Sequence, residues 1–495
     1  MSSCLQTVVL SLLCLFPCTG KVVVKEYNDL LNMQQGKTYV IKGTVDLMGH
    51  EITIPAECEF SFKGGAIENG TISFNNTKIS GKNVSFCDVK VSGKVKNEEL
   101  HANWFMAKGA SSDDYLAEGI RLACESGASF VFDDREYNFY KPIFVYGKCN
   151  LIGTGKTVVR SFENEQHIFV LAGNTAVGGK AIVWEGKIQG INFVAQTGNY
   201  NYYLGLLNVM NCEVSDCTFD LSSSGVNCSN KVIASVNNAK YSNPSQGENI
   251  SILRNVIRLQ DEDENRNNGE CIGIESRKNV LIGGNVIYNT RDDLGIHNSE
   301  SVVVRDNTIY AYDGRIFVSN SKDVEIKNNS ISYVFPTTTG MGVYVGVEPG
   351  YDSIPERIRI EKNTIDYSRA SKTACYGIRI IGANYVGILN NVVKGNTTAR
   401  IAIEATEAKA SQQNGLKNKG MLVPRHIHIE GNDTNGLWFA GYAKYKIEDL
   451  KVLNNTIRKE LVITHPDIEF RGNTINESMQ SRPAPTKSLN RYKKL

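Results

Sequence analysis

Acidic, basic and aromatic side chains recur at comparable places in neighbouring segments of the chain from about residue 270 onward. Glu275, Asp293, His297 and Arg315 each fall in a short segment where apolar and polar residues alternate. A carboxylate and an imidazole within hydrogen-bonding reach can transfer protons. A guanidinium can hold a carboxylate through two parallel hydrogen bonds. These side chains can act together only if the fold places their segments side by side.

A repeated phrase predicts how these segments are arranged. It consists of alternating apolar and polar residues followed by Asn-x-Ile or a close variant, and the steps from 285 to 307 and from 307 to 329 are both 22 residues. The copies contain Asn255, Asn285, Asn307, Asn329, Asn363, Asn391, Asn432, Asn455 and Asn473, and Ile191 and Cys217 take the equivalent place in two earlier copies. A period this short is typical of a solenoid.

The repeat predicts an all-β fold, a right-handed parallel β-helix with about three short strands per turn. The two-residue alternation is that of strands, and 22 residues are too few for a strand–helix–strand unit. One turn cannot bury its apolar side alone, but stacked turns form a continuous core. We expect the repeated asparagine to occupy a left-handed corner and to bond the asparagines of the adjacent turns.

The alternation also predicts which side chains face solvent. If Ile272 and Ile274 point inward, their neighbours point outward, and the same holds in later turns. The expected outward residues are Cys271, Gly273 and Glu275; Asp293, Gly295 and His297; Arg315, Phe317 and Ser319; then Tyr344, Arg379, Arg400, Glu404 and Trp438. Because turns stack about 4.8 Å apart, we expect Glu275 over His297 and Asp293 over Arg315, with the glycines leaving a hollow.

This face has the composition of a groove for sugars. Rings at Phe317, Tyr344 and Trp438 can stack on pyranoses, and Arg379, Arg400 and Glu404 can bind their polar groups; these six are the candidate substrate-binding residues. Glu275, Asp293, His297 and Arg315 are the candidate catalytic residues. The alternative is that these charges are ordinary cross-strand pairs on a solvated surface.

The chain outside the repeats suggests export and a cap. Residues 1–20 read as a secretory signal peptide, because the apolar stretch 8–16 is too short to span a membrane and small residues follow it. We therefore expect a secreted, periplasmic or cell-surface protein without a membrane span. Residues 21–103 form a predicted β-rich leader, and 104–476 the β-helix domain. Its single N-terminal capping helix runs from the predicted cap Ser112 to Gly127, and residues 477–495 are a predicted disordered tail.

Composition excludes some partners and cofactors. The 495 residues carry a formal net charge of +2 with 21% charged residues, which argues against a nucleic-acid groove. The nine cysteines after residue 20 are scattered without CxxC pairs and are interpreted as buried core residues. The acidic segment 261–265 offers a weak calcium site, but it lacks the glycine and closing glutamate of an EF-hand. His426 and His428 lack a third ligand, so no metal or other cofactor is expected.

One segment resembles a known family. Residues 107–155 hold Ala107-Lys108-Gly109, Asp113-Asp114, Phe130-Val131-Phe132 and Leu151-Ile152-Gly153-Thr154-Gly155. They resemble the opening segment of the pectate-lyase-like superfamily, which includes β-helical polysaccharide lyases, glycoside hydrolases and phage tailspikes. The chain departs from it at 104–106, where Trp-Phe-Met stands in place of Asp-Phe-Gly. Residues 21–103 are similar to leaders of secreted and phage-encoded β-helix proteins from gut bacteria.

The resemblance implies a carbohydrate partner and leaves the reaction open. Elimination on a uronic acid needs a base, for which Arg315, Arg379 or His297 are candidates, and cations that neutralise the carboxylate. Hydrolysis needs two carboxyl groups. Asp292-Asp293 is similar to the acid pair of polygalacturonase-like enzymes, but their partner motifs are missing here. We expect cleavage of an acidic polysaccharide, by a lyase rather than a hydrolase; the alternatives are a non-catalytic, tailspike-like adhesion protein and a purely structural solenoid.

Overall fold

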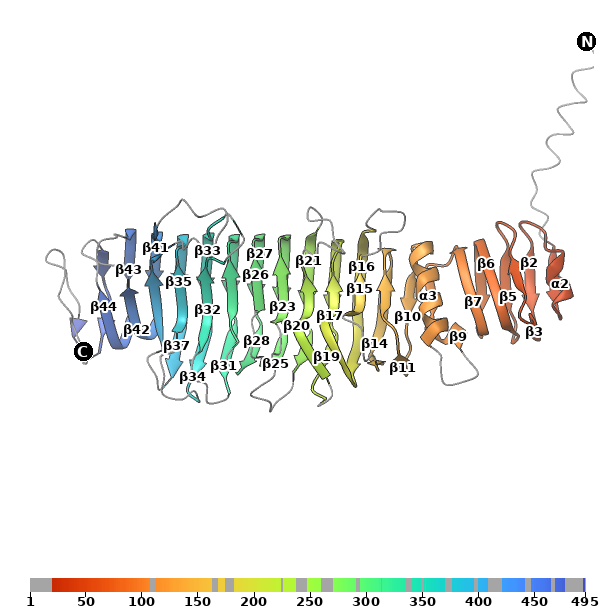
Figure 1. Cartoon of the computed structure of the whole chain (residues 1–495), viewed down its shortest axis with the longest axis horizontal. Coiled ribbons are helices and arrows are strands. Elements are labelled where there is room, and N and C mark those ends of the chain that lie inside the picture. Colours follow the sequence, from red (N-terminus) through yellow and green to blue (C-terminus); the bar gives the residue numbers. More distant parts are fainter. Residues whose placement is uncertain are drawn as a thin grey trace, which may run out of the picture. The chain divides into compact units, whose positions relative to one another are not determined.

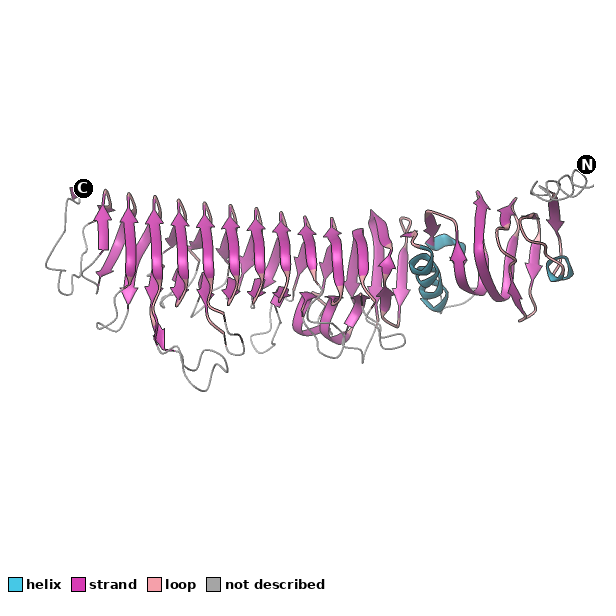
Figure 2. Ribbon diagram, turned by 90° about the horizontal axis from the view of Figure 1, so that it is seen from above, coloured by secondary structure: helices cyan, strands magenta, loops and turns pink. Residues whose placement is uncertain are grey.

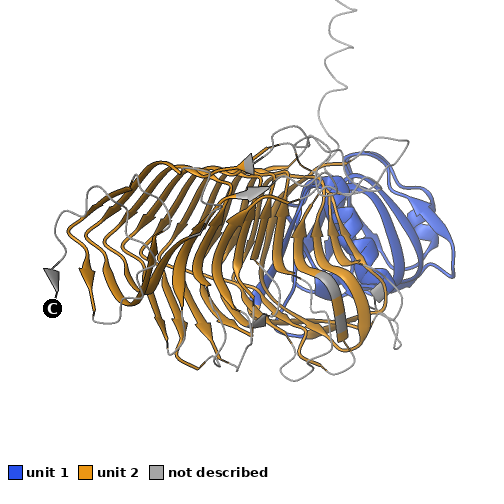
Figure 3. Cartoon of the chain, turned by 60° about the vertical axis from the view of Figure 1, so that its left-hand side comes forward, with its two compact units in different colours: residues 1–135, 147–154 blue, residues 136–146, 155–495 orange. Residues whose placement is uncertain are grey.

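The computed structural model divides the chain into two compact units, residues 1–135 with 147–154 and residues 136–146 with 155–495 (Figure 3). The residues that it describes are 20–106, 113–162, 168–173, 182–223, 226–236, 247–259, 270–290, 294–312, 314–334, 340–348, 351, 353–369, 376–395, 399–407, 421–440, 447–463, 468–476 and 493–494. The predicted signal peptide and most of the predicted tail therefore lie outside the described residues. Among the described helices, none has the length and apolar character needed to cross a membrane.

Unit 1 is a short stack of strands with an aromatic core. Its elements are β1 (Lys21–Val24), α2 (Asn28–Leu31), β2 (Thr38–Ile41), β3 (Thr44–Asp46), β4 (Glu51–Thr53), β5 (Glu59–Phe62), β6 (Ala66–Gly81), β7 (Phe86–Val95), β8 (Glu99–His101), a 3-10 turn (Ala102–Trp104), β9 (Phe105–Met106), α3 (Asp113–Ser126), β10 (Ser129–Val131) and β13 (Gly147–Lys148). Phenylalanine rings of neighbouring strands contact one another; the ring centroids of Phe74 and Phe86, for example, lie 5.9 Å apart. Unit 1 contains the whole predicted leader and α3.

The helix α3 follows the predicted pattern within unit 1. Leu116, Ile120 and Ala123 are all buried. Gly127 ends the helix with a φ of 70°, a left-handed conformation that glycine adopts without strain. The predicted cap, Ser112, lies outside the described residues.

Unit 2 is a right-handed parallel β-helix, as predicted, with three strands per turn (Figures 1 and 2). The sheet that carries the candidate site, called the site sheet, consists of β12 (Ile143–Val145), β15 (Ile168–Ala172), β17 (Gly198–Leu206), β20 (Val226–Ser235), β23 (Glu270–Glu275), β26 (Leu294–His297), β29 (Ile316–Ser319), β32 (Met341–Gly346), β35 (Tyr376–Ile381), β38 (Arg400–Glu404) and β42 (Asp433–Ala440).

Two further sheets complete each turn. The second consists of β16 (Trp184–Ala195), β18 (Val209–Ser215), β21 (Glu248–Leu253), β24 (Lys278–Gly283), β27 (Glu300–Arg305), β30 (Lys322–Lys327), β33 (Glu356–Glu361), β36 (Asn384–Leu389), β41 (Arg425–Glu430), β43 (Glu448–Leu453) and β45 (Ile468–Arg471). The third consists of β11 (Glu136–Phe139), β14 (Asn150–Ser161), β19 (Thr218–Asp220), β22 (Val256–Arg258), β25 (Val286–Thr290), β28 (Thr308–Ala311), β31 (Ser330–Tyr333), β34 (Thr364–Tyr367), β37 (Val392–Gly395), β44 (Thr456–Ile463), β46 (Thr474–Ile475) and β47 (Lys493–Lys494). A small hairpin, β39 (Thr406–Glu407) with β40 (Met421–Leu422), is antiparallel.

The repeated asparagines form a buried ladder along the helix. Asn285 Nδ2 donates to Asn307 Oδ1 at 2.9 Å, and Asn307 donates in the same way to Asn329. The same amide nitrogen of Asn307 also donates to the main-chain oxygen of Ile282, at 3.1 Å. The nine ladder members are at most 2% exposed. Each amide thus satisfies polar groups of the adjacent turns, so the ladder holds them in register.

The left-handed corner lies one residue earlier than predicted. The positive φ angles belong to the residues that precede the ladder members, such as Gly284 (67°), Asp306 (57°) and Asn328 (55°). The ladder asparagines themselves do not have positive φ angles. The corner residue is exposed and turns the chain, whereas the next residue sends its side chain into the core, where the amide finds its partners.

Candidate functional site

The outer face of the site sheet brings the predicted residues together in consecutive turns. Its central column, in order of strand register, is Gly273, Gly295, Phe317, Tyr344, Arg379, Ala402 and Trp438. Glu275 pairs with His297 in the next column, as predicted. Asp292 and Asp293 lie outside the described residues, so the predicted contact between Asp293 and Arg315 stays a prediction.

Aromatic rings and guanidinium groups alternate along this face and form what we call the aromatic–arginine ladder: Arg315, Phe317, Tyr344, Tyr376, Arg379, Arg400 and Trp438. The Arg315 Cζ atom lies 4.9 Å from the ring centroid of Phe317 and 5.2 Å from that of Tyr344. Arg379 Cζ lies 4.7 Å from the Tyr376 centroid. These distances are within the range of cation–π attraction.

The ladder continues to Trp438 at its far end. Arg400 Cζ lies 5.0 Å from the Tyr376 centroid and 4.2 Å from that of Trp438. The rings of Tyr376 and Trp438 are themselves nearly parallel, with centroids 6.2 Å apart. The ladder therefore runs without interruption from β29 to β42.

Two arginines of the ladder are held by carboxylates. Arg379 donates to both oxygens of Glu404, from Nε at 3.0 Å and from Nη2 at 2.8 Å. Arg400 Nη1 donates to Glu460 at 3.2 Å. Burial would lower the pKa of Arg379, but its hydrogen bonds to Glu404 outweigh that effect and raise it. These pairs fix the guanidinium planes against the rings.

A buried group of charges, called the histidine cluster, lies next to the ladder. It consists of Lys231, Glu270, His297, Ser319 and Glu348. The two ring nitrogens of His297 contact different carboxylates: Nε2 lies 3.1 Å from Glu270 Oε1, and Nδ1 lies 2.7 Å from Glu348 Oε2. Lys231 Nζ lies 2.7 Å from Glu270 Oε2, and Ser319 Oγ donates to Glu348 at 2.8 Å.

Two glycines make room for this cluster. A Cβ atom on Gly273 would lie 2.2 Å from Lys231 Cδ, and one on Gly295 would lie 2.5 Å from His297 Nε2. The expectation of an empty hollow above these glycines is therefore wrong. The side chains of Lys231, Glu270 and His297 fold across the glycines and fill the space, which lets charges from three turns meet.

The cluster keeps His297 protonated at neutral pH. Burial alone would lower the pKa of His297, but the hydrogen bonds to Glu270 and Glu348 and their negative charges raise it to about 9. Burial alone would raise the pKa of Glu270 and of Glu348. The contacts with His297 outweigh burial and hold the pKa of both carboxyls below the ordinary value. His297 is thus held as an imidazolium between two carboxylates.

A segment that follows β32 crosses back over earlier turns and covers Glu275. Tyr351 donates its hydroxyl hydrogen to Glu275 Oε1 at 2.8 Å. Asn320 ties the same segment down, since its side chain accepts from the main-chain nitrogen of Glu348 at 2.8 Å and donates to Ser353 O at 2.6 Å. Burial and the bond to Glu275 raise the pKa of Tyr351. These contacts hold Glu348, Tyr351 and Ser353 against the outer face of the site sheet.

Sequence reasoning missed Lys231, Glu270, Glu348, Tyr351, Tyr376 and Glu460. Strict alternation places Glu270 on the same side as Ile272, but Glu270 bonds His297 on the outer face. Cys271, which was expected to face solvent, is fully buried. Alternation thus fails at Glu270, the first residue of β23. Tyr376, the first residue of β35 and next to a register shift, is a second instance.

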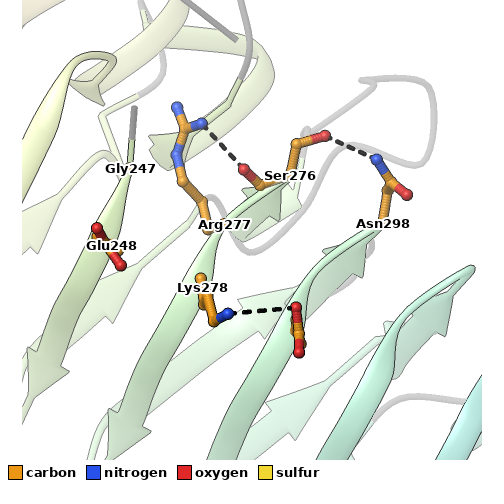
Figure 4. A pocket seen from close by; sticks show the side chains of 7 residues that line it. Gly247, Glu248, Ser276, Arg277, Lys278 and Asn298 are labelled. Atoms are coloured by element: carbon orange, nitrogen blue, oxygen red, sulfur yellow. Dashed lines mark hydrogen bonds and ion pairs between the residues drawn. The ribbon is translucent and has the colours of Figure 1, made fainter. Parts of the chain in front are cut away.

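A pocket of volume ≈ 280 Å³ lies at the corner beyond β23 and β26 (Figure 4). Its lining includes Arg277, which is 2% exposed and donates to the main-chain oxygens of Leu207 at 3.0 Å and Val236 at 2.7 Å. Burial lowers the pKa of Arg277 to about 10. Because main-chain oxygens use these donors, Arg277 braces the corner.

Neither predicted metal candidate gains support. Within the described ranges, no three His, Cys, Asp or Glu side chains are grouped so as to hold a metal ion. The acidic segment 261–265 lies outside those ranges. His426 pairs with Asp449 at 3.1 Å and His428 with Glu430 at 3.0 Å, and the two histidine side chains are 40% and 43% exposed.

The comparisons with known proteins concern the fold. A family model described as a right handed beta helix region matches residues 263–416. Solved structures similar to this chain include the A-module of the mannuronan C-5 epimerase AlgE6 of Azotobacter vinelandii, at 13% identity and a TM-score of 0.46 over 78% of this chain and 100% of that one. No curated protein matches the sequence.

Two other similar structures come from different sources. A mannuronic acid specific polysaccharide family 6 lyase from human gut microbiota has 12% identity and a TM-score of 0.41, over 93% of this chain and 87% of that one. A mutant tailspike protein of E. coli bacteriophage HK620, in complex with a hexasaccharide, has 9% identity and a TM-score of 0.44, over 75% and 68%. At these identities no residue role is carried over.

Proposed function

We propose that this chain is a secreted carbohydrate-active protein that binds an extended acidic polysaccharide along the aromatic–arginine ladder and cleaves it by elimination. The observation that carries the proposal is the unbroken alternation of rings and guanidinium groups from Arg315 to Trp438. Turns repeat about every 4.8 Å, which is close to the length of one pyranose in an extended chain. Each turn can therefore offer one sugar a ring for stacking and a charged group for its substituents.

The state of the carboxyls favours elimination over hydrolysis. A glycosidase needs one carboxyl that stays protonated to act as the general acid. Here the cluster contacts hold the pKa of Glu270 and of Glu348 low. Glu404 is bonded by Arg379, and Glu460 by Arg400. Glu270 and Glu348 are therefore not held protonated before substrate binds, which hydrolysis requires and elimination does not.

Elimination can be assigned to Arg315, which stacks on Phe317, and to Glu348, which bonds His297 and Ser319. Arg315 would neutralise the uronate carboxylate and so acidify the neighbouring C–H bond. Glu348, whose side chain is 32% exposed and bonded to the His297 imidazolium, would accept that proton. As the C–H and glycosidic C–O bonds break, a C=C bond forms, and Glu348 passes the proton to the leaving oxygen. Two of the bases considered from sequence are already engaged. His297 is protonated, and Arg379 is bonded to Glu404.

The test is an assay of the purified chain on a panel of uronic-acid polysaccharides. Elimination gives an unsaturated product that absorbs in the ultraviolet, whereas hydrolysis gives reducing ends without that absorbance. We expect ultraviolet-absorbing product, and its loss by at least about a hundredfold in Glu348→Gln with binding retained. Arg458→Ala, which removes an exposed arginine bonded to Asp433, is the matched control and leaves the rate unchanged. Reducing ends without absorbance would contradict elimination.

Non-catalytic glycan binding is the second candidate, favoured by one observation. Both ring nitrogens of His297 already contact carboxylates, so this histidine offers no lone pair for chemistry. Binding of the polysaccharide without either kind of product would support an adhesion protein that uses the same ladder.

A further inference from the structure

Among the residues that the structure describes, the aromatic–arginine ladder is open on only one side of the histidine cluster. From this we infer that the chain cleaves its polysaccharide from one end and releases short products of a single length. The inference rests on the proposed function, since it concerns how the same face acts. It follows from what occupies the outer columns of the site sheet before and after the cluster.

Before the cluster, the outer face is closed by apolar side chains. In strand register the central column continues backward from Gly273 through Ala234 and Gly205 to Leu171. Leu171, Tyr202, Leu207, Ala234 and Val236 form an apolar cluster of their own, in which no member is more than 7% exposed. These positions of β15, β17 and β20, and the residue that follows each strand where it is named here, therefore offer a sugar chain no free surface.

The cluster itself closes the next two turns. The space over Gly273 and Gly295 holds the side chains of Lys231, Glu270 and His297. His297 is 6% exposed, and Tyr351 covers the adjacent Glu275. The closed surface thus extends up to Phe317.

After the cluster, the face is accessible. Arg315, Tyr344, Tyr376 and Trp438 are each partly exposed. A polysaccharide that places one uronate on Arg315, which stacks on Phe317 and Tyr344, can extend along the axis only toward Trp438. The part of the polysaccharide on the other side of the cleaved bond, toward the histidine cluster, must then be short, because the closed surface leaves it no further room.

The experiment follows product sizes and solution viscosity together during cleavage of a long, uniform polyuronate by the full chain. We expect one short product from the first turnovers, with viscosity falling only in proportion to bonds cleaved. Early products of many lengths with a rapid fall in viscosity would overturn the inference while leaving the proposed function intact. No unsaturated product from any polyuronate would instead reject the proposed function, and this inference with it.

A variant at the open end tests the direction. Trp438→Ala removes the last ring of the aromatic–arginine ladder and should raise KM for long chains roughly tenfold, with product length unchanged. Arg458→Ala is the control and should change neither KM nor product length. An unchanged KM for long chains in Trp438→Ala, while binding of short chains persists, would show that the substrate does not run toward this end.

Discussion

Glu275 lies directly beside His297 in the register of β23 and β26, yet the carboxylate that bonds the Nε2 atom of His297 belongs to Glu270. Glu275 instead accepts a hydrogen bond from Tyr351. Strand register therefore places two residues side by side, but the direction of each side chain decides which network it joins. Here the glycines at 273 and 295 let Glu270 reach across.

The pH dependence of stability follows from His297. Its pKa is about 9 in the fold against an ordinary 6.5, so its stabilising contribution is complete below about pH 6.5 and is lost as pH rises through 9. The loss is on the order of 3 kcal/mol. Denaturant unfolding at a series of pH values should show this fall in wild type and a flat alkaline limb in His297→Gln. An equal alkaline fall in both proteins would contradict it.

The loss of stability at acidic pH should come from the two carboxylates that contact His297. Glu270 and Glu348 have pKa values below the ordinary 4.5, so their contribution is present above that pH and is lost as pH falls through the lowered values. Glu348→Gln should weaken this acid dependence when unfolding is measured between neutral pH and about pH 3. A variant as acid-sensitive as wild type would argue against the ion pairs.

The two glycines under the cluster can be tested singly. Gly295→Ala places a methyl group 2.5 Å from His297 Nε2, so we expect a loss of about 1–3 kcal/mol. Gly387→Ala is the matched control, because a Cβ atom there meets only Leu389, at 3.8 Å. Thermal unfolding of both variants makes the comparison. Equal stability of the two variants would mean that the histidine cluster does not need a glycine at position 295.

The asparagine ladder should carry a measurable share of the stability. Asn329→Ala removes the bonds to Asn363 and Val304 and leaves the amide groups of Asn307 without their acceptor. We expect a loss of roughly 1–3 kcal/mol for the buried groups left unsatisfied. Asn328→Gly changes the adjacent exposed corner residue, whose φ is 55°, and should be nearly neutral. If denaturant unfolding shows Asn328→Gly to be less stable than Asn329→Ala, the asparagine ladder does not stabilise the fold in the way described.

Buried cysteines should not react in the folded chain. Burial raises the pKa of Cys212 and of Cys217 to about 12, so hardly any thiolate exists at pH 8. Alkylation followed by mass spectrometry should label both positions in denaturant and neither in buffer. Rapid labelling in buffer would show that the interpretation as core residues is wrong.

The 22-residue repeat predicted the β-helix and the registers of Glu275 with His297 and of Phe317 with Tyr344, because turns of constant length stack residues at constant spacing. It could not reveal Glu348 and Tyr351, which come from an insertion that interrupts the period. Nor could it reveal Lys231, which reaches Glu270 from the preceding turn over a glycine. Side chains that lean across turns obey local packing, which the repeat does not encode.

The central claim is that a polysaccharide lies along the aromatic–arginine ladder. The most direct test is calorimetry, in which acidic oligosaccharides of increasing length bind to wild type and to Trp438→Ala. The claim predicts that affinity rises with each added sugar in wild type and that the gain from the longest oligosaccharides disappears in the variant. Affinity independent of length, or identical length dependence in both proteins, would contradict it.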